Sequence, residues 1–347
     1  MKRLLITLAA IVALLAAYGG VFYVLNSSSV AAAQDVRTNL NPSPSASGRT
    51  LEIMTWNLGY GGLGAGSDFV ADGGESTFPP SRTAVRENVA GIARTLESRV
   101  DATNVFLFQE IARGGPINYW VDLKRSVDRT LAGNHWLFNP DFLTRFMPWP
   151  LRMEHGTAIY TGGEIADFGV VPLPAQSARI MGVTRRYAAL YARMPISEAE
   201  GGGGWTVVSL HLAAFDENAT VRTRQLRELL AWAQTEYEAG RHVVLGGDFN
   251  LILAETDFPH TTEERFLFWV FPFPQDALPD GWRIVTDPTT PSVRTNERPY
   301  VAGENYTANI DGFIISPNVT LESVEGVDLG FRHADHQPVV ARFRAAP

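Results

Sequence analysis

The residues with the clearest chemical potential in this sequence stand where apolar runs stop. In "HVVLGGDFNLIL", residues 242–253, an apolar run ends in two glycines that are followed by Asp248 and Asn250. A strand that serves only a hydrophobic core has no reason to end on this set, whereas a buried strand is a rigid mount for functional side chains. Similar residues end or interrupt other apolar runs: Asn57 after "LEIMTW", Gln109 and Glu110 after "NVFLF", His211 in "VVSLHL", Asp311 in "NIDGFIIS", and Asp335 and His336 in "RHADHQPVV".

A single acid at the end of a strand is usually a turn or a helix cap. Six such sites, all drawn from Asn, Glu, His and Asp, are hard to explain as caps. Together they suit hydrolysis of a phosphate ester, which needs a Lewis acid, an aligned water and donors for the charge that grows on the phosphate oxygens. Glu110 and Asp335 offer the hard oxygen ligands that Mg²⁺ or Mn²⁺ prefers.

The remaining candidates suit the other parts of that reaction. Asp248 can accept a proton from water. Asn250, His211 and a protonated His336 can donate hydrogen bonds to the phosphate. A carboxylate beside His336 would fix its tautomer and raise its pKa, favouring the charged donor.

The elements that must hold these residues are short strands separated by helices and Gly/Pro-rich loops. Periodicity predicts helices over residues 82–98 and 220–239. The predicted strands are "LEIMTWNL", "NVFLFQE", "GTAIYT", "YAALYARM", "WTVVSLHL", "HVVLGG", "NIDGFIIS" and "PVVARF". Mixed strands and helices over this length predict one α/β domain that begins near Leu51 and runs to residue 347.

Composition narrows the classes of protein. The chain is 45% hydrophobic and 19% charged, an ordinary globular balance, and it has no cysteine, so any metal must be held by oxygen or nitrogen ligands. Its net charge of −8 makes it a poor binder of long polyanions, although a local arginine patch can still guide a substrate. Lys2 and Lys124 are the two lysines, so a phosphate contact would come from a forked guanidinium.

The N-terminus predicts export. Lys2 and Arg3 precede the uncharged residues 4–25, a stretch longer than the ~7–15-residue apolar region of a cleaved signal and close to the ~20 residues that span a bilayer. We therefore expect residues 1–25 to be a membrane anchor with its N-terminus in the cytoplasm. A signal cleaved before Gln34, after the small residues Ala31 and Ala33, remains the alternative. Residues 26–50, rich in Ser, Pro and Ala, predict a flexible linker.

The motifs in chain order resemble those of the endonuclease/exonuclease/phosphatase superfamily, the DNase I-like metal-dependent phosphoesterases. The resemblance covers residues 51–343 and rests on "MTWNLGYGG", "FLFQE", "GTAIY", "VVSLHLAA", "GGDFN", "NIDGFIIS" and "HADHQPV". It implies a four-layered α/β sandwich, with two mixed sheets packed face to face and helices outside.

The resemblance also implies roles for single residues. Glu110 resembles the family's metal-binding glutamate, with Asn57 and Asp335 supporting or completing the metal site. Asp248 and Asn250 resemble the pair that positions the nucleophilic water and the phosphate. His336 resembles the family's catalytic histidine, and Asp311 resembles the carboxylate that orients it. His211 resembles the histidine found in the deoxyribonuclease and sphingomyelinase branches.

Simpler interpretations stay open for some positions. Asn57 can equally be a structural turn residue, and His211 a core histidine. We expect His155 and His333 to be structural or peripheral, and Asp72 and Glu75 to be solvated in a long loop. The aromatic segment 266–282 is interpreted as a loop packed on the core, with a lid or a lipid-contacting surface as alternatives.

The function predicted from these residues is that of an exported, membrane-tethered, Mg²⁺- or Mn²⁺-dependent phosphoesterase that acts as a monomer. Its substrate stays open between a lipid headgroup, nucleic acid and a small phosphate ester, because a fold does not decide among them. A catalytically silent, anchored domain that binds a phosphate ligand is the alternative from a different class.

Overall fold

A computed structural model describes residues 2–28, 31, 35–40, 44–176, 179–180 and 182–346. The larger of two main sheets has seven strands, in the spatial order β1 (Arg37–Asn39), β4 (His135–Leu143), β5 (Glu154–Thr161), β3 (Val105–Ala112), β2 (Thr50–Asn57), β17 (Val339–Ala345) and β16 (Val319–Gly326). The second has six, in the order β12 (Arg283–Val285), β15 (Asp311–Ile315), β11 (His242–Asp248), β10 (Gly204–His211), β9 (Ala188–Pro195) and β6 (Asp167–Pro172).

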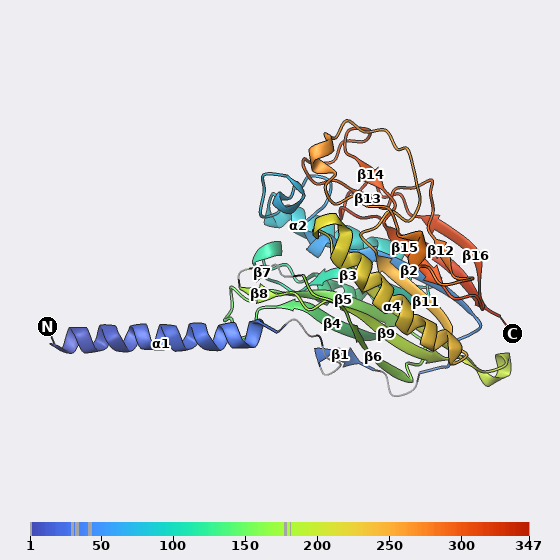
Figure 1. Ribbon diagram of the computed structural model, residues 1–347, viewed down its shortest axis with the longest axis horizontal. Coiled ribbons are helices and arrows are strands. Elements are labelled where there is room, and N and C mark those ends of the chain that lie inside the picture. The colour runs from blue at the N-terminus through green and yellow to red at the C-terminus, as the bar shows by residue number, and fades with distance from the viewer. Residues whose placement is uncertain are drawn as a thin grey trace.

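Outside the main sheets, the described residues also form four α-helices, two short hairpins and several one-turn 3-10 helices. The helices are α1 (Lys2–Asn26), α2 (Arg82–Glu97), α3 (Leu123–Thr130) and α4 (Thr220–Glu238). The hairpins pair β7 (Arg179–Ile180) with β8 (Val183–Thr184), and β13 (Val293–Arg294) with β14 (Thr307–Ala308). Figure 1 shows α1 projecting away from the remainder of the chain.

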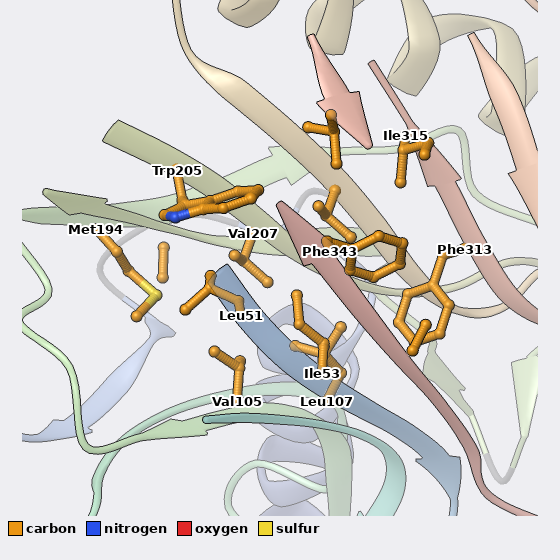
Figure 2. Close-up of a cluster of buried hydrophobic side chains, with 14 of the residues drawn as sticks. Leu51, Ile53, Val105, Leu107, Met194, Trp205, Val207, Phe313, Ile315 and Phe343 are labelled. Atoms are coloured by element: carbon orange, nitrogen blue, oxygen red, sulfur yellow. The ribbon is translucent and has the colours of Figure 1, made fainter. Parts of the chain in front are cut away.

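The two main sheets enclose the central core because each strand sends alternate side chains to opposite faces. Leu51, Ile53 and Leu107 of one sheet meet Trp205 and Val207 of the other, and all five are fully or almost fully buried (Figure 2). This core holds the sheets face to face, as the predicted sandwich requires.

The outer faces of the sheets carry the helices. Met54, Phe106 and other residues on the far face of the first sheet pack against Val85 and Ile92 of α2 and Val127 of α3. Leu226 and Leu229 of α4 pack in the same way on the second sheet. The order of layers is therefore helix, sheet, sheet, helix, which is the predicted four-layered α/β sandwich.

Local signals placed most of these elements correctly. The predicted helix at 82–98 is α2, which begins after Ser81, whose hydroxyl accepts a hydrogen bond from the Ala84 amide at 3.0 Å as an N-cap. The predicted helix at 220–239 is α4, and each of the eight predicted strands is present.

Several elements were not predicted, namely α3, β4, β6 and β16 and the short strands β1, β7, β8, β12, β13 and β14. Strand β4 illustrates why, because "HWLFNPDFL" contains a proline, which normally counts against a strand. The register of β4 with β5 shifts between Asn139 and Phe142, so a bulge accommodates Pro140.

The predicted flexible linker has to be corrected. Within residues 26–50, Arg37–Asn39 forms β1 on the edge of the large sheet, antiparallel to β4. Ser47 is buried, and its amide donates to the Pro195 carbonyl at 2.8 Å. An edge strand offers unpaired backbone groups that a polar segment can satisfy, whatever its side chains are. The alternative cleavage position before Gln34 lies outside the described residues.

Candidate active site

Strand register brings three of the predicted residues into one row. Parallel pairing of β10 with β11 sets His211 opposite Asp248, and antiparallel pairing of β11 with β15 sets Asp248 opposite Asp311. Laterally paired residues project from the same face of a sheet. The three side chains, separated by up to 100 positions in sequence, therefore lie on neighbouring strands of the second sheet.

The first sheet contributes from the carboxyl ends of two parallel strands. Asn57 ends β2 and Glu110 lies near the end of β3, where the two strands pair in parallel. The Asn57 amide donates to Asp248 Oδ2 at 3.0 Å, so this contact joins the two sheets. The loop before β17 brings Asp335 and His336 to the same place.

A cavity of about 670 Å³ opens where these elements meet. Seven of the eight predicted residues line it, namely Asn57, Glu110, His211, Asp248, Asn250, Asp335 and His336. Asp311 is the eighth and lies fully buried behind the cavity, where its Oδ2 is 2.8 Å from His336 Nδ1. The structure thus brings all eight side chains to a single location.

A bulge directs Glu110 into the cavity. The pairing of β3 with β5 shifts between Phe108 and Ile111, and Glu110 has a φ of 50°, so its side chain leaves the regular alternation of the strand. The Tyr60 hydroxyl donates to Glu110 Oε1 at 2.6 Å. Gly59 precedes this tyrosine, and a Cβ atom there would lie 2.6 Å from Asp335 Oδ1, so only glycine lets the backbone approach this closely.

The turn after β11 holds Asp248 and Asn250 together. The Asn250 amide N–H donates to Asp248 Oδ1 at 2.9 Å, which is an Asx turn. Its side chain donates to the Leu212 carbonyl at 3.0 Å. The turn leaves Asp248 Oδ2 to face Asn57 and the two histidines, at 3.5 Å from His211 Nε2 and 3.8 Å from His336 Nε2.

His336 is held as a cation. Burial disfavours the charged ring, but the carboxylates of Asp311 and Asp248 outweigh burial and hold the pKa of His336 well above its usual value. Asp311 is itself fixed by the Ser292 hydroxyl, which donates to its Oδ2 at 2.7 Å. A protonated His336 can therefore donate to an anion in the cavity through Nε2.

His211 has the opposite electrostatic environment. Burial and the adjacent Arg185 guanidinium lower the pKa of His211 well below its usual value. Arg185 Nη2 lies 2.9 Å from His211 Nδ1, and a guanidinium can only donate, so Nδ1 accepts and Nε2 carries the proton. His211 is then a neutral donor toward the cavity.

Glu110 and Asp335 form a carboxylate pair suited to a hard cation. Burial, and next the charge of Asp335, raise the pKa of Glu110 to about 8. Asp335 Oδ1 is buried and has no hydrogen-bond partner among the described residues. Both features fit a divalent ion bound through oxygen, which would relieve the repulsion and satisfy the bare oxygen.

Ligand atoms of Asp248, Asp311 and His336 also lie within 4.8 Å of one another and could in principle hold a metal. The hydrogen bond between His336 Nδ1 and Asp311, however, satisfies that nitrogen already. We therefore favour an acid–base arrangement for these three residues and a cation site at Glu110 and Asp335.

Sequence reasoning was wrong about Asp72, which does not lie in solvent. Asp72 lines the cavity, and burial raises its pKa to about 7. The Asn296 side chain donates to Asp72 Oδ2 at 2.6 Å and to Asp335 Oδ2 at 2.8 Å, so it links this loop to the carboxylate pair.

The prediction that His155 is structural or peripheral was incomplete, because His155 lines the cavity. Its Nδ1 lies 3.2 Å from Asp141 Oδ1, and Asp141 also accepts two hydrogen bonds from Arg185, at 2.8 and 2.6 Å. Asp141, Arg185 and Tyr60 were not singled out from the sequence. Only the position of His155 before "GTAIYT" hinted at this side of the site.

The aromatic segment 266–282 packs largely on the core, as the simpler interpretation held. Trp269, Phe273 and Trp282 are buried, and Trp269 also lines the cavity. Phe268 is exposed and lies 5.9 Å, between ring centroids, from the exposed Phe215.

The sequence model of a protein family, described as "Endonuclease/Exonuclease/phosphatase family", matches residues 54–330 of this chain. None of the curated proteins compared with the chain matches it by sequence.

Several solved structures share the fold at low sequence identity. An endonuclease/exonuclease/phosphatase from Beutenbergia cavernae has a TM-score of 0.57 at 18% identity, covering 86% of this chain and 72% of its own. TDP2 from D. rerio, complexed with a single-strand DNA product, has a TM-score of 0.53 at 15% identity, covering 85% and 99%. The human Nocturnin catalytic domain with bound sulfate has a TM-score of 0.51 at 15% identity, covering 90% and 98%. At such identities the likeness shows the fold alone.

Proposed function

Because the chain belongs to the endonuclease/exonuclease/phosphatase family, we propose that it hydrolyses a phosphate ester with the help of a bound divalent cation. One observation carries the proposal. A pair of carboxylates, the half-buried Glu110 and the buried Asp335, shares one cavity with a histidine, His336, that a third carboxylate holds in its charged form. A divalent cation held there and a charged hydrogen-bond donor in the same cavity would both stabilise the negative charge that develops on a phosphate during hydrolysis.

The protein's own residues take the following parts in this proposal. Asp248 Oδ2 accepts a proton from the attacking water, and the Asn57 amide holds that carboxylate in position. His211 Nε2–H, the free N–H of the Asn250 amide and His336 Nε2–H donate to the phosphate oxygens. Asp311 orients His336 and keeps it protonated.

Glu110 and Asp335 would hold the cation, with Asn57 supporting the site. The oxygen donors suit Mg²⁺ or Mn²⁺, and such an ion, when bound, acts as a Lewis acid on a phosphate oxygen. Burial raises the pKa of Asp248 to about 6. The carboxylate form, which accepts the proton, therefore predominates only above about that pH.

The test is hydrolysis by the full chain in the presence and absence of EDTA. Bis(p-nitrophenyl) phosphate, p-nitrophenyl phosphate, a choline phospholipid and DNA cover the open substrate classes. We expect one class to be hydrolysed, with activity lost in EDTA and restored by Mg²⁺ or Mn²⁺. Full activity after dialysis against excess EDTA would contradict the proposal, and phosphate binding without turnover of any substrate would favour the silent binding domain.

We further propose that the catalytic domain, residues 51–347, is exported as a monomer and tethered by α1. Residues 2–26 form a continuous helix whose most apolar 18-residue window has a mean hydropathy of 2.4, and no residue of that window is buried against the domain. A helix of this length and composition can cross a bilayer, and a signal sequence has the same features. Lys2 and Arg3 support an orientation with the N-terminus in the cytoplasm.

A further inference from the structure

The loop between β4 and β5 exposes an unusual group of apolar side chains. Phe146, Trp149 and Leu151 have exposed fractions of 56%, 79% and 53% within only six residues. A contiguous exposed apolar group of this kind marks a contact surface when it lies beside another apolar element. We call residues 144–152 the apolar loop.

Helix α1 fixes this loop at two levels. At its end, Asn26 exchanges two hydrogen bonds with the Arg145 backbone, at 2.9 and 2.8 Å. Two turns earlier, the Tyr18 hydroxyl donates to the Phe146 carbonyl at 2.9 Å, and the two rings lie 5.1 Å apart. At ~1.5 Å per residue, Tyr18 and Asn26 are ~12 Å apart along the axis, so the loop runs back beside the helix.

This placement sets the depth of the loop in a membrane. A hydrocarbon core of ~30 Å takes up ~20 helical residues, so a span that starts at Leu4 ends near Tyr23. Tyr18 then lies five residues, or ~7.5 Å along the helix axis, inside the outer end of the span, and Phe146 lies beside it, so the tip of the loop reaches the acyl chains. Aromatic side chains concentrate near the boundary between acyl chains and headgroups, as do arginines whose charged ends reach the surface. Arg145 and Arg152 flank the aromatic residues of the loop.

The same loop forms a wall of the catalytic cavity. Phe142 of β4 and Met153, which flank the loop, pack with Val183 of β8 and with Phe22 of α1. Phe142, Leu151 and Met153 also line the cavity. Figure 1 shows the end of α1 entering the domain beside β7 and β8. Phe142 and Met153 therefore lie between the end of the helix and the cavity.

Other exposed apolar residues line the cavity as well. Val70, Phe78 and Phe215 are exposed and contribute to its lining, together with Leu151 of the loop. The cavity lining therefore combines buried charged side chains with exposed apolar ones. This combination suits contact with an amphiphilic lipid surface better than contact with water.

We infer that the apolar loop inserts into the bilayer that α1 crosses, on the domain's side, so that the cavity opens at the level of the lipid headgroups. The inference rests on the anchor part of the proposed function. The occupant of this surface is the lipid bilayer itself, because the loop continues the apolar face of a helix that already lies in it. An ester whose apolar part stays in that bilayer can then place its phosphate in the cavity without leaving the membrane.

The absence of cysteine makes the inference directly testable. A Trp149→Cys variant of the full chain gives a single thiol, which an NBD fluorophore labels in vesicles of phosphatidylcholine and phosphatidylglycerol. Val100→Cys is the matched control, since Val100 is exposed but precedes β3, at the opposite end of the strand from Glu110. Neither residue lines the cavity.

We expect the probe at 149 to emit at shorter wavelength and to be quenched by lipids that carry a nitroxide near the top of the acyl chain. The probe at 100 should be quenched by aqueous iodide instead. Equal iodide quenching at both positions, with α1 shown to be intact by mass, would overturn the inference. A blue shift without nitroxide quenching would also overturn it, because a second copy of the chain would then cover the loop.

This readout needs no turnover. If the probe at position 149 is quenched by iodide and not by the nitroxide lipids while hydrolysis is EDTA-sensitive, only the membrane contact is contradicted. If nitroxide lipids quench the probe in a preparation that hydrolyses none of the substrates, only the proposed chemistry is contradicted.

Discussion

The contact between His336 and Asp311 allows a sharp test of the proposed chemistry. In Asp311→Asn, the amide oxygen can take the place of Oδ2 and still accept from the Ser292 hydroxyl and from His336 Nδ1–H. The amide nitrogen would then take the place of Oδ1, which has no partner among the described residues. The substitution therefore keeps the tautomer and the geometry but removes one negative charge.

The expected losses follow from that difference. Removing a positioned acid, base or charged donor costs about 10²–10⁴ in rate, and we expect His336→Ala to fall in the upper part of this range. Asp311→Asn should lose about 100-fold in kcat/KM, which is ~2.7 kcal/mol of transition-state stabilisation, because the donor survives with less charge. The double variant should be scarcely slower than His336→Ala, since Asp311 acts through the histidine.

The pH dependence gives the second half of the test. If charged His336 is the donor, activity is present below its raised pKa and is lost as pH rises through that pKa. Loss of the Asp311 charge lowers the pKa, so the alkaline limb of kcat/KM should move to lower pH in Asp311→Asn. Asp311→Asn keeps both hydrogen bonds and should unfold close to the wild-type temperature, whereas His336→Ala leaves the buried Asp311 carboxylate without its cationic partner and should unfold at a lower temperature.

The assay is kcat/KM against pH on whichever ester of the panel is hydrolysed, with thermal unfolding measured on the same preparations. Additive losses in the double variant, or an alkaline limb that does not move, would refute the coupling. In either case His336 and Asp311 would act separately.

Three further outcomes are expected. Glu110→Gln should abolish metal-dependent activity and the rise in Tm that Mg²⁺ causes in the wild type. In EDTA at pH 9 the variant should unfold at a higher temperature than the wild type. The reason is that the pKa of Glu110 is raised from 4.5 to about 8 on folding, so the wild type loses stability as pH rises between these two values. Arg222→Ala should lower the free energy of unfolding by ~3–5 kcal/mol in a denaturant titration, because the buried guanidinium binds Asp216 and the carbonyls of Asn250 and Trp269, whereas Arg224→Ala, at an exposed site, should change it by less than ~0.5 kcal/mol. Membrane fractions should retain the full chain after carbonate washing, and a soluble mature form that begins at Gln34 would instead establish a cleaved signal.

The order of amino acids alone determined the framework of the site. Strands β3 and β11 contain continuous apolar runs, and the ends of these runs are visible in sequence because a Gly, an amide or a carboxylate interrupts the core-facing pattern. Parallel pairing of β2 with β3 and of β10 with β11 gathers the carboxyl ends of these strands on one side of each sheet. Asp311 reaches the same place from the start of the antiparallel β15, and Asp335 and His336 reach it from the loop before β17. The signal in the sequence was a polar side chain where an apolar run stops or begins.

The tertiary structure alone decided what surrounds them. Asp72 and Asp141 occupy a loop and a strand whose sequence gives no sign of a cavity, and β1 arises because an open sheet edge was available to a polar segment. His211 and His336 have identical side chains, yet their pKa values move in opposite directions. Electrostatic energy depends on distance in space, and the groups responsible, Arg185 for one and Asp311 for the other, lie 26 and 25 positions away in the chain, so only the folded structure assigns each histidine its charge.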